Sequence, residues 1–226
     1  MSDKNDDLSR WYKSKIGKKI AGLERRILMP IVNHFRPFRC LELASSPLIC
    51  MQSVKEKVNV SSRFDCSVNG VGSCVISDFS TLPFASESFD LVLCVHVHET
   101  CRYSGRIIAE LSRVLMPEGL VVFIGFNPYG LWRKKDFLLQ NSWWDNPMTC
   151  DDLMTLAKMC SLEEVYTEYF GYGLGLDEKM VCAAMLAYWR RKWLPSSGVL
   201  YKTVVRKRVL AKTSPLLVEN AVLENM

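Results

Sequence analysis

Apolar residues recur at helical spacing in several parts of the chain. From Trp11 to Phe35 they stand at every third or fourth position, which predicts a long amphipathic helix broken near Pro30. The same spacing predicts helices over 104–116, 149–160 and 178–193, and a shorter one around 48–54. Thr149, followed by two aspartates, is suited to cap the helix over 149–160. The polar residues 1–9 are expected to be mobile.

Short apolar runs between these helices predict strands. Strands are expected over 39–43, 57–62, 74–78, 163–170 and 199–208, and the continuous runs "FDLVLCVHV" and "LVVFIGF" are typical of strands buried on both faces. Strand and helix alternate through this region, which implies a parallel sheet with helices on both faces and right-handed crossovers. Ligands of such sheets bind beyond the carboxyl ends of the strands. The residues to consider therefore follow the strands, in the ranges 42–47, 78–79, 94–99 and 125–129.

Composition narrows the class of protein. A chain of 226 residues with 49% hydrophobic residues fits one packed α/β domain with additions. Its nine cysteines form no CxxC pair, which favours reduced thiols in a cytoplasmic protein. The longest apolar runs are too short for a transmembrane segment.

Positive charge gathers near both ends of the chain. Between Arg10 and Arg39 the only acid is Glu24, and 190–212 holds eight basic residues and no acid. Either these are solvated faces, or they form a surface that meets anionic lipid headgroups, nucleic acid or an acidic partner.

The middle of the chain resembles a known enzyme family. The segments "LPFASESFDLVLCVHVHE" and "IIAELSRVLMPEGLVVFIGFNP" are similar to those of class I S-adenosylmethionine-dependent methyltransferases of type 11, and the resemblance covers roughly 39–128. It implies a Rossmann-like three-layer α/β sandwich with a mostly parallel seven-stranded sheet and an antiparallel C-terminal strand. The chain then divides into a basic helical segment over 1–36, the methyltransferase-like domain over 37–210 and a tail over 211–226.

The resemblance also implies S-adenosylmethionine as cofactor and suggests which residues bind it. Glu42 takes the place of the acid near the end of the first strand. Asp78 takes the adenine position with Phe79 beside the ring, and Cys94 lines the methyl donor. The first loop falls at Ala44, Ser45 and Ser46.

Two features depart from the family pattern. The first loop holds no glycine, so a backbone with positive φ would cost roughly 1 kcal/mol or more per residue there. The second predicted strand ends in Ser61, Ser62 and Arg63, where the family has an acid for the ribose hydroxyls.

Each remaining candidate has a structural alternative. His96 is a candidate general base beside the cofactor, or a hydrogen-bonded structural residue; His96 and His98 would share one strand face, and a metal site is not expected. Tyr129 is the second catalytic candidate, and Asn127 and Trp132 are candidate substrate contacts, although Asn-Pro is also an ordinary turn. The structural alternative for Glu42 is a strand-end acid paired with a nearby base. For Asp78 it is an Asx turn or a helix cap.

The sequence thus predicts a methyltransferase of unknown acceptor, small molecule or other, that acts by positioning cofactor and substrate. The alternative is a catalytically degenerate methyltransferase fold that serves as a binding or scaffold protein through its basic surfaces, because fold alone does not decide function.

Overall fold

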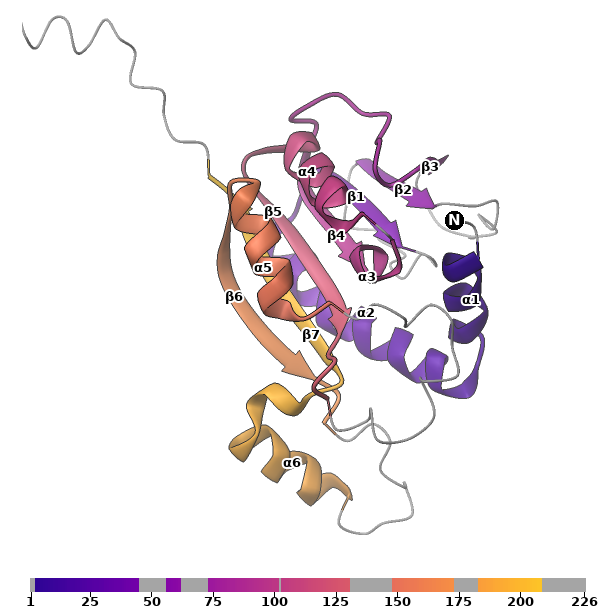
Figure 1. Ribbon diagram of the computed structural model, residues 1–226, viewed down its shortest axis with the longest axis vertical. Coiled ribbons are helices and arrows are strands. Elements are labelled where there is room, and N and C mark those ends of the chain that lie inside the picture. The colour runs from indigo at the N-terminus through magenta and orange to yellow at the C-terminus, as the bar shows by residue number, and fades with distance from the viewer. Residues whose placement is uncertain are drawn as a thin grey trace, which may run out of the picture.

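The structure is a computed structural model that describes residues 3–44, 56–61, 73–101, 103–130, 148–172 and 183–208 (Figure 1). Its centre is a seven-stranded sheet in the order β3-β2-β1-β4-β5-β7-β6. Strand β7 is antiparallel to both of its neighbours, and the other pairs are parallel. The predicted mostly parallel sheet with an antiparallel C-terminal strand is therefore confirmed. The strands are β1 (Arg39–Ala44), β2 (Glu56–Ser61), β3 (Ser73–Ile76), β4 (Phe89–Val95), β5 (Leu115–Phe126), β6 (Leu162–Phe170) and β7 (Leu200–Lys207).

Helices cover both faces of this sheet, as the three-layer prediction requires. Figure 1 shows α4 and α5 in front of the sheet, α2 behind it, and α1 beside the carboxyl ends of the strands. Helix α6 lies apart from the sheet, beyond the end of β6. The helices are α1 (Asp3–Tyr12), α2 (Lys15–Phe35), α3 (Val97–Thr100), α4 (Ser104–Val114), α5 (Cys150–Met159), α6 (Ala183–Trp193) and the 3₁₀ helix η3 (Pro195–Ser197).

The sheet separates two hydrophobic clusters. Strand residues alternate between them, because successive side chains of a strand point to opposite faces. Leu41 and Leu43 of β1 pack in the cluster with α4 and α5, whereas Cys40 and Ala44 pack in the cluster with α1 and α2. This sandwich holds the carboxyl ends of β1, β4 and β5 side by side.

The N-terminal region differs from its prediction. Residues expected to be mobile form α1 from Asp3 onward, and the helical break falls at Lys13 and Ser14 instead of Pro30. Ser14 caps α2, since its hydroxyl accepts a hydrogen bond from the amide of Gly17 at 3.0 Å. Helix α2 continues through Pro30.

Other boundaries agree more closely. Thr149 caps α5 in a reciprocal capping box with Asp152, as the sequence suggested. Helix α4 ends at Val114, two residues early, because β5 already begins at Leu115 and carries the "PEG" turn as an irregularity in its pairing with β4. The short helix predicted around 48–54 lies outside the described residues.

Candidate active site

The predicted cofactor residues of β1 lie at the carboxyl edge of the sheet. Glu42 is buried between its partners Asn59 of β2 and Leu93 of β4, with 1% of its surface exposed. Ala44, the last residue of β1, pairs with Val95, the last residue of β4. This places Ala44 directly at the edge where a cofactor would enter. Ser45 and Ser46 lie outside the described residues, so the glycine-poor loop itself is not described.

Asp78 follows β3 as an exposed residue in an Asx turn. Its Oδ1 accepts hydrogen bonds from the amide and the hydroxyl of Ser80, both at 2.9 Å. Within the described part of the chain, Oδ2 makes no hydrogen bond. The turn therefore leaves one carboxylate oxygen available, and the structural and the binding interpretations of Asp78 are compatible.

Phe79 and Cys94 are buried in the cluster beneath α4 and α5. Phe79 is 2% exposed and Cys94 is fully buried. Burial raises the pKa of the Cys94 thiol well above its ordinary value, so this cysteine is an unreactive packing residue. Both residues are therefore core residues that present no open surface to a ligand, contrary to the predicted places of Phe79 beside the adenine ring and Cys94 beside the methyl donor.

His96 does not lie on a strand, contrary to the prediction that it shares a strand face with His98. Strand β4 ends at Val95, and His96 adopts a left-handed backbone (φ 58°) that begins α3. Its imidazole lies between two carboxylates: Nε2 is 2.8 Å from Oε1 of Glu24, and Nδ1 is 2.7 Å from Oε2 of Glu99. The ring also stacks on Phe126, with 4.0 Å between the ring centroids.

Two further donors complete this buried cluster. The hydroxyl of Tyr12, in α1, lies 3.0 Å from both oxygens of Glu24, and the amide of Phe126, at the end of β5, donates to Glu99 at 2.6 Å. We call Tyr12, Glu24, His96 and Glu99 the buried acid–histidine cluster. It joins α1, α2, the end of β4 and the end of β5 through buried hydrogen bonds.

The electrostatics of the cluster favour a charged imidazole. Burial alone lowers the pKa of His96, but Glu99 and Glu24 outweigh it and raise the pKa to about 9. The imidazolium donates to a carboxylate from each nitrogen, so no lone pair is left to accept a proton from a substrate. With both ring nitrogens engaged in this way, the geometry does not support the predicted role of His96 as general base.

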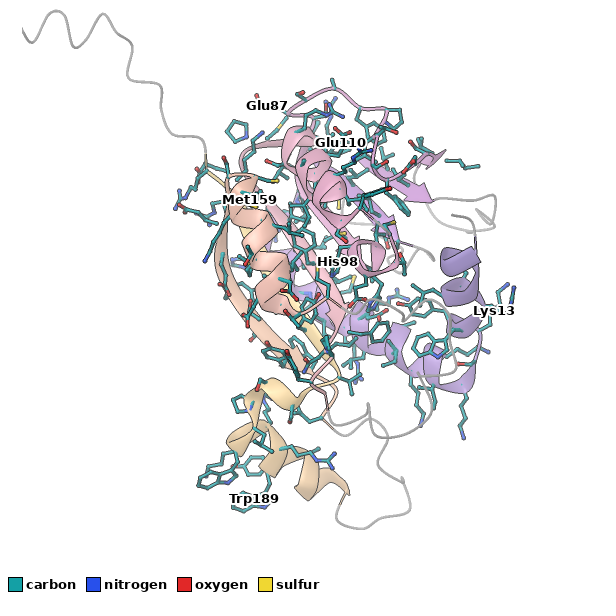
Figure 2. All side chains as sticks on the ribbon, in the orientation of Figure 1. Lys13, Glu87, His98, Glu110, Met159 and Trp189 are labelled. Atoms are coloured by element: carbon teal, nitrogen blue, oxygen red, sulfur yellow. The ribbon has the colours of Figure 1, made fainter. Side chains whose placement is uncertain are left out.

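His98 lies on the other side of β4, near the centre of Figure 2. Its Nε2 is 2.8 Å from the hydroxyl of Tyr201 on β7. Burial, reinforced by the charge of His96, lowers the pKa of His98 to about 3. Of the two histidines of "HVHETC", His96 therefore favours the protonated form and His98 the neutral form. No group of residues able to hold a metal ion occurs in the ranges that the structure describes.

Asn127 ties the turn after β5 to the start of β7. Its Nδ2 donates to the carbonyls of Ser196 and Gly198 at 2.6 and 2.7 Å, and its Oδ1 accepts from the amide of Tyr129 at 3.1 Å. These bonds occupy the side-chain amide, which fits the turn interpretation better than substrate contact. Tyr129 itself is 73% exposed. Trp132 lies outside the described residues.

Sequence reasoning did not identify Tyr12, Glu24 and Glu99 as members of one cluster. A signal was present for Glu24, because the only acid of the basic helix stands four residues after Ile20, on the apolar stripe. A carboxylate on a buried stripe requires a partner. The partner, 72 residues away, could not be read from helical spacing.

Comparison with known proteins agrees with the fold. Residues 40–123 match the family model of the methyltransferase domain. A 73-residue stretch is 37% identical to the uncharacterized protein YafS of Escherichia coli, and it covers 32% of this chain and 30% of that protein.

Solved structures resemble the chain over a longer range. A SAM-dependent methyltransferase from Archaeoglobus fulgidus has a TM-score of 0.64 at 16% identity, over 83% of this chain and 94% of that one. A SAM-dependent methyltransferase from Thermotoga maritima has a TM-score of 0.63 at 14% identity, over 90% and 95%. Across the described ranges, every helix is too short or too polar to serve as a bilayer span.

Proposed function

Because this chain has the class I methyltransferase fold and carries a methyltransferase domain of type 11, we propose that it binds S-adenosylmethionine at the carboxyl edge of β1, β3 and β4 and transfers its methyl group. The match of residues 40–123 to the methyltransferase domain is the observation that carries the proposal. The acceptor is left open.

The residues at this edge fit the cofactor. The buried carboxylate of Glu42 and the exposed oxygen Oδ2 of Asp78 are acceptors suited to the hydroxyl and amino groups of a nucleoside. Ala44 brings only a methyl group to the edge. The cofactor supplies a methyl group that is already activated as a sulfonium, so the protein needs mainly to bind and orient the two reactants.

Among the catalytic candidates, Tyr129 is the residue we retain. Its exposed side chain follows β5 on the side of the sheet where an acceptor would approach. His96 holds the N-terminal helices against the strand ends and thereby shapes that approach.

A second function is favoured by one specific observation. Trp11 and Tyr12 pack against Phe126 and His96, so α1 fills space beside the carboxyl ends of β4 and β5. A fold whose strand ends are filled in this way and that no longer binds the cofactor would serve as a binding or scaffold module whose basic surfaces meet an anionic partner.

Thermal unfolding with added S-adenosylhomocysteine separates the two functions. A functional cofactor site predicts a melting temperature that rises with ligand concentration, since a ligand that binds only the native state stabilises it. A folded sample whose melting temperature does not change at millimolar ligand would refute the methyltransferase proposal and favour the scaffold.

A further inference from the structure

A groove of about 860 Å³ runs along the face of the sheet that carries α2. Its walls are α2 on one side and strands β5, β7 and β6 on the other. None of the residues predicted to bind cofactor or substrate lines it. The groove is therefore a separate feature of the fold, in the size range of small-molecule sites (~300–1,000 Å³).

The lining of the groove is mostly apolar. The aliphatic and aromatic residues come from all four elements: Leu23, Ile27, Ile31, Leu120, Val204 and Phe170. Three further apolar side chains of the lining stay largely exposed to solvent, Phe35 at 37%, Val165 at 46% and Tyr166 at 39%. An apolar chain that entered the groove would cover them.

The charge of the groove is positive. Glu168 is the acid among the described lining residues, and it forms an ion pair with Lys202. The ammonium of Lys202 also lies over the rings of Tyr166 and Phe170. Lys202 and Glu168 thus neutralise each other, and the lining retains the charges of Arg26 and Arg206.

These two arginines lack close acidic partners within the described residues. Arg26 makes no ion pair there. Nη1 of Arg206 is 3.8 Å from Glu118, whose carboxylate bonds more closely to Arg208 at 2.8 Å. The Nε of Arg206 is buried and has no hydrogen-bond partner in the described structure. A buried guanidinium donor of this kind can donate to an acceptor that enters the groove, and a carboxylate is a stronger acceptor there than a neutral group.

From this combination we infer that the groove binds a long-chain carboxylate, with its hydrocarbon chain between α2 and β6 and its carboxylate at an arginine. The basic segments from the two ends of the sequence meet here, since Arg26 belongs to the first and Lys202 and Arg206 to the second. The inference does not depend on cofactor binding.

Calorimetric titration of the full chain with decanoate tests whether the groove binds a carboxylate. Decanol, which has the same chain length and no charge, is the control ligand. We expect saturable binding of decanoate at one site and clearly weaker binding of decanol. No saturable binding, or equal affinity for the two ligands, would overturn the inference.

Two pairs of variants locate the site. Val165→Asp places a carboxylate in the groove at an exposed position, and Ile76→Asp introduces the same carboxylate on β3 at a similar exposure of 48%. Arg26→Gln removes a groove charge, and Arg25→Gln removes its exposed neighbour on α2, which does not line the groove. Val165→Asp and Arg26→Gln should each weaken decanoate binding by about tenfold or more, because the first adds a negative charge beside the ligand and the second removes a positive charge that attracts its carboxylate.

The control variants should bind like the unchanged protein. Equal weakening by a variant and its control would contradict the assignment, and the melting temperature of each variant shows whether it is folded. Sedimentation gives a further decisive result: a dimer that Val165→Asp converts to a monomer would mean that a second copy covers the groove, which excludes the carboxylate.

Discussion

The carboxylate of Glu24 lies 2.8 Å from Nε2 of His96, although the two residues are 72 positions apart in the sequence. Both side chains are fully buried or nearly so. This pair connects the N-terminal helices to the end of β4, next to the edge where the cofactor is proposed to bind. The orientation of α1 and α2 is thus set by a charged contact inside the protein as well as by apolar packing.

Replacing Glu24 by Ala should destabilise the fold strongly. The substitution leaves Tyr12 without its acceptor and reduces the compensation of a buried imidazolium, so we expect a loss of about 3–5 kcal/mol in the free energy of unfolding by urea. The matched control is Glu163→Ala, which breaks an exposed ion pair with Arg208 and should cost far less, because solvent screens such a pair. Equal losses in the two variants would show that the buried pair contributes no more than a surface pair.

Stability should depend on pH in opposite directions through the two histidines. The pKa of His96 is raised to about 9, so its contribution is complete below its ordinary value of 6.5 and is lost as pH rises toward 9. The pKa of His98 is lowered to about 3. Below pH 6.5 this histidine is protonated in the unfolded chain but stays neutral in the native state, so stability falls as pH drops. The free energy of unfolding should therefore be greatest near neutral pH.

Single variants can show which histidine causes the loss of stability at alkaline pH (the alkaline limb) and which causes the loss at acidic pH (the acidic limb). Across a pH range of about 5 to 9, His96→Gln should flatten the alkaline limb and His98→Gln the acidic limb. His34, exposed near the end of α2, supplies the control His34→Gln, which should preserve both. An alkaline limb that survives in His96→Gln would contradict the charge state assigned to His96.

The two glycines of α2 should respond oppositely to alanine. A Cβ at Gly17 would lie 2.2 Å from the carbonyl oxygen of Trp11, whereas a Cβ at Gly22 would meet nothing within 4 Å. Gly22→Ala should stabilise the protein by roughly 0.5–1 kcal/mol through helix propensity. Gly17→Ala should lower the melting temperature, because the close turn between α1 and α2 must open. A stabilising Gly17→Ala would show that this turn is not rigid.

Asn127→Asp should weaken the junction between β5 and β7. The change replaces a donor that serves two main-chain carbonyls with a carboxylate that repels them, at a cost of about 3 kcal/mol or more. Asn33→Asp on the exposed surface of α2 is the control, and thermal melting compares the two. A variant Asn127→Asp as stable as its control would show that these two hydrogen bonds do not hold the junction together.

The sequence predicted what depends on periodicity and missed what depends on distant contacts. Continuous apolar runs placed β4 and β5, and the capping residues placed the start of α5, because these signals are local. The break at Ser14 was missed since it depends on how closely α1 approaches Gly17, and His96 was assigned to a strand because "FDLVLCVHV" is apolar through Val97. Its contacts to Glu24 and Glu99 arise only when α2 packs on the sheet.

For the candidate site, the sequence predicted which residues lie near the strand ends but did not predict which of them are buried. The positions of Glu42, Ala44 and Asp78 at strand ends follow from the alternation of elements and from the family resemblance. The burial of Phe79 and Cys94 beneath α4 and α5 does not, because a strand-end residue can face either the ligand or the core.

Calorimetric titration with S-adenosylhomocysteine tests the central claim most directly. The unchanged protein should bind one equivalent of ligand. Asp78→Asn, which keeps the Oδ1 acceptor for Ser80 but removes the charge, should bind about tenfold more weakly or worse. Asp151→Asn, the same change at an exposed position of α5, should bind normally. Absence of binding to the folded, unchanged protein, or equal binding by the two variants, would contradict a cofactor site at this edge.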